Sequence, residues 1–158
     1  MSGLVAAALL VVLAILLFAI AWTDIRSGVI RNSHNAVLAL SGVAYNYLQA
    51  GSVLASLTGA LFGGSILYLV FAIHRFWRGQ AGLGLGDVKF MIGAGAWVNW
   101  YGIAPLLVFS SLMALVFLVV TRKSLRHDHR LPFGPFLAAA LALVFSAERL
   151  DLAPWAVV

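Results

Sequence analysis

Six apolar segments follow one another along the chain, separated by short polar or Gly- and Pro-containing breaks. They cover residues 3–23, 34–50, 52–74, 88–100, 101–121 and 135–150. A helix needs about 20 predominantly apolar residues to cross the hydrocarbon core of a bilayer. The pattern therefore predicts an all-α membrane protein with six transmembrane helices, of which 88–100 and 135–150 are short for a full crossing.

The composition agrees with this pattern and limits the chemistry. Of the 158 residues, 63% are hydrophobic and only 9% are charged, whereas a soluble globular domain carries about 25% charged residues. Six spans with tight connections use almost the whole chain, so we expect a single membrane domain over residues 1–158. The chain has no cysteine, which excludes disulfides, thiolate nucleophiles and Cys-ligated metal centres.

The ten basic residues outnumber the five acidic ones, an excess that either nucleic-acid binding or a membrane could explain. Nine of the ten fall within or directly beside three breaks between the apolar segments: Arg26, Arg31, Arg75, Arg78, Lys89, Arg122, Lys123, Arg126 and Arg130. The positive-inside rule places such breaks in the cytoplasm, which puts both the N-terminus and the C-terminus outside. We therefore expect the lipid bilayer, and no nucleic acid, to be the partner of these charges.

Small and polar residues predict how the spans pack. Ala55, Gly59 and Gly63 repeat at four-residue spacing and predict that another helix approaches 52–74 closely. Three polar residues of 34–50 could hydrogen-bond across helices or line a cavity, and we favour hydrogen bonds: Asn35, Asn46 and Gln49.

Four aromatic residues are expected in a belt at the outer membrane interface, where rings with one polar atom are enriched. They are Trp97, Trp100, Tyr101 and Trp155.

The five carboxylates of the chain are not equivalent. Glu148 and Asp151 flank Arg149 and are expected to form a solvated cluster, and Asp128 lies in the charged loop "RHDHR". Asp24 ends the first apolar segment and Asp87 opens the fourth, directly after "GLGLG". On the predicted topology both stand at the cytoplasmic edge of the membrane, where ionisable groups are costly and are usually paired or functional.

Two aspartates at one membrane edge can hydrolyse a peptide bond. If the first and fourth helices are neighbours, the carboxyl groups of Asp24 and Asp87 can face each other and share one proton. The ionised carboxylate then takes a proton from water, and the protonated partner supports the attacked carbonyl and the leaving nitrogen. Glycines before Asp87 allow positive φ angles and close approach of an extended substrate.

Simpler explanations exist for each aspartate and for the histidines. Asp87 is a natural helix N-cap after a glycine loop, and Asp24 could balance the charge of Arg26. The glycines lack the spacing of a phosphate-binding loop. The histidines in the Arg-rich loop, His127 and His129, together with His34 and His74, are poor candidates for a metal site.

Two other functions compete with hydrolysis. Carboxylates near a membrane also serve in small proton- or cation-coupled transporters, although these usually carry polar residues at the midplane and repeated halves. A non-catalytic membrane factor of a larger assembly is the other alternative, and the presence of both aspartates argues against it.

Three segments resemble a known family in the same order along the chain. "GLGD" at 84–87 resembles the motif of the GxGD-type intramembrane aspartic peptidases, and "DIRSGVIRN" at 24–32 resembles a segment of the type IV prepilin peptidases. "LPFGPFLAAA" at 131–140 is similar to the segment that opens the last helix of that family. The resemblance implies a GxGD-type core with Asp24 and Asp87 as catalytic residues.

The resemblance also implies a set of substrate-binding residues: Gly84, Gly86 and Lys89. Lys89 could orient a carboxylate or bind a backbone carbonyl, and a snorkelling membrane anchor explains it equally well. One departure from the family pattern is Arg31, which stands where proline is usual. A less rigid loop after Asp24 would weaken substrate contacts there without touching the aspartates.

The chain is most similar to the short, peptidase-only form of this family found with Flp/Tad-type pilus systems. That form lacks the methylase region and the cysteine tetrad of the long bifunctional enzymes, so we expect no methyltransferase activity. The resemblance implies cleavage of the leader peptide of Flp-like type IV prepilins at the cytoplasmic face of the bacterial inner membrane, without metal or cofactor. The sequence indicates no particular oligomeric state.

Overall fold

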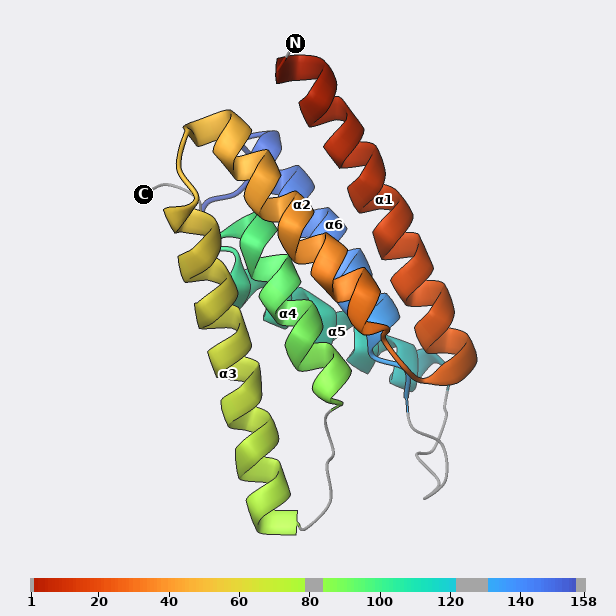
Figure 1. The fold of residues 1–158 in the computed structure, drawn as a ribbon. Coiled ribbons are helices and arrows are strands. Elements are labelled where there is room, and N and C mark those ends of the chain that lie inside the picture. Colours follow the sequence, from red (N-terminus) through yellow and green to blue (C-terminus); the bar gives the residue numbers. More distant parts are fainter. Residues whose placement is uncertain (1, 79–83, 122–130, 156–158) are drawn as a thin grey trace.

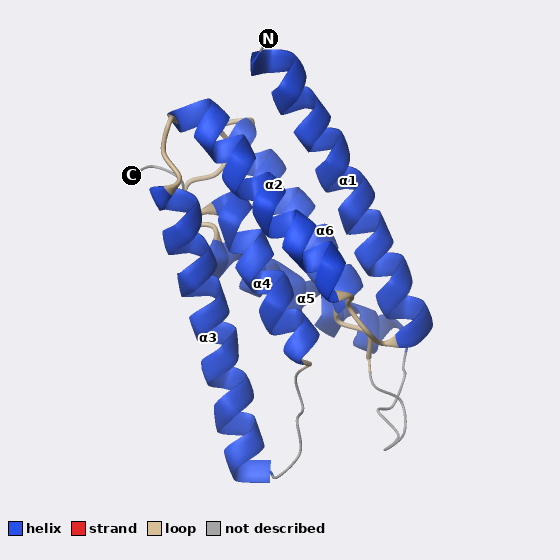
Figure 2. Ribbon diagram, in the orientation of Figure 1, coloured by secondary structure: helices blue, strands red, loops and turns tan. Residues whose placement is uncertain are grey.

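A computed structural model describes residues 2–78, 84–121 and 131–155. In these residues the chain forms helices joined by turns and contains no strand (Figure 2). The helices are α1 Ser2–Ser27, α2 Asn32–Ala50, α3 Leu54–Arg78, α4 Leu85–Val98, α5 Ile103–Thr121 and α6 Gly134–Arg149. The predicted all-α architecture is confirmed.

Two helix boundaries differ from the predicted ones where the candidate aspartates lie. The helix predicted over 3–23 continues to Ser27, so Asp24 is inside α1. It ends at Gly28, which has a φ of 63° and donates its N–H to the carbonyl of Asp24 at 2.8 Å, a helix end that glycine adopts without strain. The helix predicted over 88–100 already begins at Leu85, which places Asp87 in its first turn.

Successive helices run in opposite directions, and the start of α1 and the end of α6 lie at one end of the bundle (Figure 1). The opposite end, called the site end below, contains the end of α1, the start of α2 and the first turns of α4 and α6. There α3 continues past the first turn of α4. The alternation agrees with six antiparallel helices, and the number of crossings and the side on which the termini lie stay predictions.

Helix α4 lies at the centre and packs mainly against α3 and α2, with further contacts to α6. Gly59 of α3 lies directly against the Gly95 carbonyl of α4, and a Cβ at Gly63 would come within 3.0 Å of Met91. Any larger side chain at Gly59 would overlap the α4 backbone. Gly59 and Gly63 therefore serve close packing within the chain, as predicted, whereas Ala55 is exposed.

Polar side chains join α2, α3 and α4 inside the bundle. Asn46 donates from Nδ2 to Oγ of Ser56 at 2.9 Å and to the carbonyl of Ala96 at 2.8 Å, and all these groups are buried. Buried amides need such partners. The prediction that Asn46 bonds across helices is confirmed, whereas Gln49 is exposed.

Trp97 does not lie in an interfacial belt, so that part of the aromatic prediction is wrong. Its side chain is 1% exposed and packs between the rings of Tyr45 and Phe145. Its Nε1–H donates to the carbonyl of Leu38 at 2.9 Å. Because the indole N–H has a partner in the core, the ring can be buried completely. Trp100 is 49% exposed, as a belt residue would be.

The expected solvated cluster at the end of α6 is also only partly present. Asp151 is exposed, but Glu148 is half-buried and accepts a 3.4 Å hydrogen bond from Nε1 of Trp155. Asp128 lies outside the described residues.

Among the described residues, three helices are long and apolar enough to cross a membrane: Gly3–Ser27, Leu54–Trp77 and Ile103–Thr121. The chain is thus a multi-pass membrane protein. Helix α4, with 14 residues, is about 21 Å long at 1.5 Å per residue, which is shorter than a hydrocarbon core of about 30 Å. Protein rather than lipid surrounds it, since most of its residues are buried, so it need not match the bilayer.

Candidate active site

Asp24 lies near the end of α1 and points into the protein. Its side chain is only 6% exposed. Oδ2 accepts a 2.7 Å hydrogen bond from the backbone N–H of Gly134, the first residue of α6. A bond this short is typical of a carboxylate acceptor, and it joins two residues that are 110 positions apart in the sequence.

Asp87 lies in the first turn of α4 and is 9% exposed. The N-cap of this helix is Gly84, not Asp87, so the interpretation of Asp87 as the cap residue is wrong. Asp87 is the third helical residue, and its Oδ2 accepts the N–H of Gly84 at 3.2 Å. This is the carboxylate half of a capping box, and it fixes the side chain beside the glycine turn.

The two carboxyl groups are close enough to interact electrostatically, although α1 and α4 are not direct neighbours. The expectation that these two helices are direct neighbours is wrong. In the described residues the Cα atoms of α1 and α4 stay more than 8 Å apart, while α2 and α6 pack against both helices. The two aspartates therefore interact through their side chains and not through contact between the backbones of α1 and α4.

Burial and proximity determine how much charge this pair can carry. Two buried carboxylates repel each other when both are ionised, and the low dielectric strengthens the repulsion. Each has one backbone N–H that stabilises an ionised oxygen. The arrangement favours one negative charge shared by Asp24 and Asp87, which is the state needed for general acid–base chemistry.

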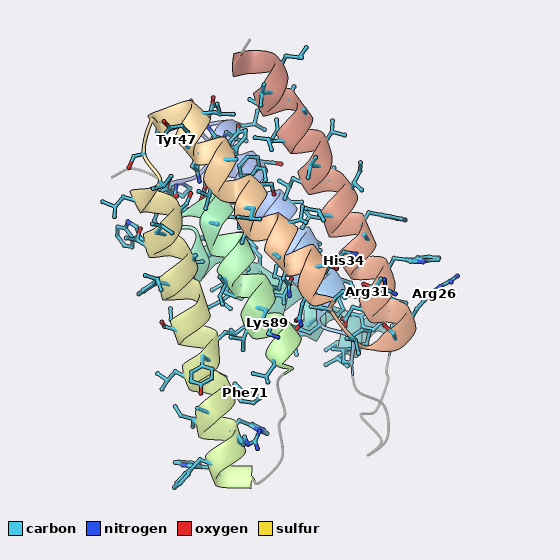
Figure 3. All side chains as sticks on the ribbon, viewed as in Figure 1. Arg26, Arg31, His34, Tyr47, Phe71 and Lys89 are labelled. Atoms are coloured by element: carbon cyan, nitrogen blue, oxygen red, sulfur yellow. The ribbon has the colours of Figure 1, made fainter. Side chains whose placement is uncertain are left out.

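The first turn of α4 is held against the start of α2. A Cβ on Gly86 would lie 3.3 Å from Cβ of Ile30. Asn35 donates from Nδ2 to the carbonyl of Gly86 at 3.4 Å, and Lys89 donates from Nζ to Oδ1 of Asn32 at 2.9 Å. Figure 3 shows Lys89 at the site end, together with Arg31 and His34.

The glycines before Asp87 do not use the positive φ angles that the sequence suggested. Gly84 has a φ of −76°, and Gly86 lies within α4. The residue at 86 is small because Ile30 leaves little space, so packing explains it. Gly82 lies outside the described residues. That Gly84, Gly86 and Lys89 bind substrate stays a prediction.

Arg31, at the position where the family usually has proline, keeps a proline-like backbone. It is the N-cap of α2, with φ −68° and ψ 138°, and proline fixes φ near −65°. The loop after Asp24 therefore follows a course that proline would also allow.

Gly134 is a site residue for which the sequence predicts no role, although it lies in the segment "LPFGPF". The only signal for it in the sequence is the place of this segment at the start of the last helix. As to metals, the part of the chain that the structure describes has no group of three or more His, Asp or Glu residues that could hold an ion. His127 and His129 lie outside that part.

Residues 11–119 match the protein family described as "Type IV leader peptidase family". A relative from Burkholderia pseudomallei, named "Prepilin leader peptidase/N-methyltransferase", is 33% identical over 78% of this chain and 41% of its own length. "Leader peptidase HopD" of Escherichia coli is 34% identical over 81% of this chain and 83% of its own length.

A third relative, from Neisseria gonorrhoeae, carries the same name as the Burkholderia protein and is 29% identical over 87% of this chain and 48% of its own length. The chain thus spans less than half the length of these two relatives. No solved structure shows a significant match. Because the family match covers more than half of the residues and HopD is similar over most of both chains, the chain belongs to the type IV leader peptidase family.

Proposed function

We propose that this protein is an aspartic endopeptidase that removes the leader peptide of prepilins, with Asp24 and Asp87 as its catalytic residues. One observation carries the proposal: two buried, interacting carboxyl groups at one end of the bundle, each held by a backbone N–H. The family and the names of the relatives supply the substrate class, and the Flp-like type is the finer part of the proposal.

In this mechanism a water molecule lies between the two side chains. The ionised carboxylate takes a proton from the water as its oxygen attacks the scissile carbonyl carbon. The protonated partner donates a hydrogen bond to the developing oxyanion and then gives its proton to the leaving nitrogen.

The substrate chain would bind in an extended conformation beside the first turn of α4. Gly84 is exposed and has an extended-region backbone, and Lys89 places an exposed ammonium group nearby. In this proposal Gly84 and Gly86 allow the substrate backbone to approach Asp87, and Lys89 binds a substrate carbonyl oxygen.

The proposed topology has six crossings, with both termini outside and the site end at the cytoplasmic face of the bacterial inner membrane. Exposed basic residues at the site end support this orientation: Arg26, Arg31 and Lys89 (Figure 3). The guanidinium of Arg26 packs over the ring of Trp22 at 4.3 Å, a combination suited to a lipid headgroup region.

We further propose that the 158 residues form one peptidase domain without methyltransferase activity, metal or cofactor. HopD, which is named as a leader peptidase alone, has most of its length in common with this chain. The two relatives named as bifunctional enzymes are more than twice as long as the part that matches.

The test uses purified protein in detergent or liposomes with an Flp-like prepilin as substrate. Wild-type protein should cleave the leader, and Asp24→Asn and Asp87→Asn should each abolish cleavage while the proteins stay folded and inserted. Asp151→Asn is the matched control, because this exposed carboxylate follows the last residue of α6, the end of that helix opposite to its first turn at the site end, and should be dispensable. Near-normal turnover in either Asp24→Asn or Asp87→Asn would rule out the pair.

A further inference from the structure

Gly134 is buried at the start of α6 and contacts Asp24 from a helix that carries neither aspartate. Its N–H donates the 2.7 Å hydrogen bond to Oδ2 of Asp24. No other donor to the Asp24 carboxyl group is found in the described residues. The orientation of this carboxyl group therefore depends on the position of one backbone amide.

The N–H of Gly134 is the donor to Asp24 because the next residues of α6 offer no free N–H that could take its place. Pro135 has no N–H, and the amides of Phe136 and Leu137 both donate to the carbonyl of Phe133 at 3.1 Å. The first amides of a helix have no partner within the helix and carry the positive end of its dipole. The α6 terminus thus presents one amide, that of Gly134, to the charge on Asp24.

Residue 134 has no space for a side chain. A Cβ there would lie 2.8 Å from Oδ2, 2.9 Å from Cγ and 3.0 Å from Cβ of Asp24. These contacts are shorter than carbon atoms in proteins tolerate, and all three are with Asp24 itself. An alanine at 134 would therefore push against the carboxylate rather than against the surrounding core.

We propose that Gly134 is a positioning residue of the peptidase, which holds Oδ2 of Asp24 so that Oδ1 faces the attacking water and Asp87. This inference rests on the proposed function. The donated hydrogen bond fixes the rotamer of Asp24, and the missing side chain lets the carboxylate lie against the α6 backbone. An enzyme with a displaced Asp24 carboxylate would still bind the substrate, but the carboxylate would no longer align the attacking water.

The first experiment compares Gly134→Ala with Gly42→Ala in the prepilin cleavage assay. A Cβ at Gly42 would lie 2.7 Å from Cδ1 of Trp97 and 2.9 Å from the Ala96 backbone, which is an equally severe overlap without a carboxylate. We expect Gly134→Ala to lower kcat by about 100-fold with KM changed less than about twofold, since misplacement by about 1 Å can have that effect. Gly42→Ala should lower the unfolding temperature and leave kcat near the wild-type value.

Equal kcat values for Gly134→Ala and wild type, or equal kcat losses in both glycine variants, would overturn the inference. The second outcome would mean that residue 134 acts only through packing. If wild-type protein does not cleave any prepilin, the proposed function fails, and a second measurement without catalysis then decides about Gly134.

That measurement is NMR of protein labelled with ¹³C′-Phe and ¹⁵N-Gly, which selects the two Phe–Gly amides of the chain, Gly63 and Gly134. The Asp24→Ala substitution should move the Gly134 amide proton upfield, because its hydrogen bond is lost, and leave Gly63 in place. A Gly134 amide that does not respond to Asp24→Ala would show that the two residues are not coupled.

Discussion

The Nζ atom of Lys89 lies 2.9 Å from Oδ1 of Asn32, so one hydrogen bond joins the first turns of α4 and α2 just beyond Asp87. If Lys89 acts through this bond, Lys89→Met and Asn32→Ala should each lower kcat/KM by about fivefold, the equivalent of a hydrogen bond worth about 1 kcal/mol. The double variant should lose no more than either single variant, because both remove the same interaction. Steady-state kinetics of the four proteins measures this coupling.

A direct contact between Lys89 and the substrate would give another pattern. Lys89→Met would then raise KM, whereas Asn32→Ala would leave KM and kcat unchanged. Normal kinetics in Asn32→Ala would thus show that the bond to Asn32 is not the main role of Lys89.

Arg31→Pro should be tolerated despite its place between Asp24 and α2. The φ of −68° at Arg31 already matches proline, and proline at a compatible position stabilises a protein by about 0.4–1 kcal/mol through the unfolded state. We expect a cleavage rate within about twofold of wild type, because the backbone geometry at residue 31 is unchanged. The unfolding temperature should be slightly higher. A large drop in both would mean that the Arg31 side chain or N–H has a role of its own.

The pH dependence of kcat/KM should be bell-shaped. At low pH both Asp24 and Asp87 are protonated, so no base is present and the rate is low. The rate should rise as the pair loses its first proton and fall as it loses the second, because the acid is then gone. Cleavage measured with a single prepilin across acidic to alkaline pH checks this. A flat profile over that range would argue against a proton-sharing pair.

Asn46→Ala should destabilise the bundle without changing the chemistry. It removes the buried bonds to Ser56 and to the Ala96 carbonyl, and leaving such groups unsatisfied costs about 1–3 kcal/mol. Gln49→Ala, in the same helix but exposed, is the matched control and should have little effect. Thermal unfolding in detergent gives the stability, and kcat measured well below the transition should stay normal.

Cleavage should persist after dialysis against EDTA, because the proposed mechanism needs only the two carboxyl groups and water. Activity is measured before and after chelation, with added zinc as a further condition. Complete loss with EDTA that zinc restores would replace the aspartate mechanism with a metal-dependent one.

The sequence predicted the positions of the helices along the chain better than it predicted which helices pack against each other. Apolar periodicity and breaks located all six helices, and the charge pattern placed Asp24 and Asp87 at the same end, because these signals are local in the chain. That α1 and α4 are separated by α2 and α6 depends on the packing of whole helices. The sequence could not show this, since only small-residue patterns such as Gly59 and Gly63 indicate which faces meet.

The sequence predicted individual residues least well where a hydrogen-bond partner comes from a distant part of the chain inside the protein. Trp97 looked like an interfacial residue because it lies close to other aromatic residues, but its N–H bonds to Leu38 inside the core. Gly134 had no assigned role because its contact with Asp24 joins residues far apart in the sequence. In both cases the deciding interaction is a tertiary hydrogen bond with a backbone group, which no local pattern encodes.

The two aspartates belong to helices with different surroundings. Helix α1 exposes Val11, Ile15 and Phe18 on its outer face, where lipid chains would touch it, whereas α4 is enclosed by other helices. Helices in contact with lipid tilt when the hydrophobic thickness of the bilayer changes. We therefore expect a change in membrane thickness to act on Asp24 through the lipid-facing α1 and not directly on Asp87, so the acyl-chain length of the lipids becomes a variable for the relative position of the two carboxyl groups.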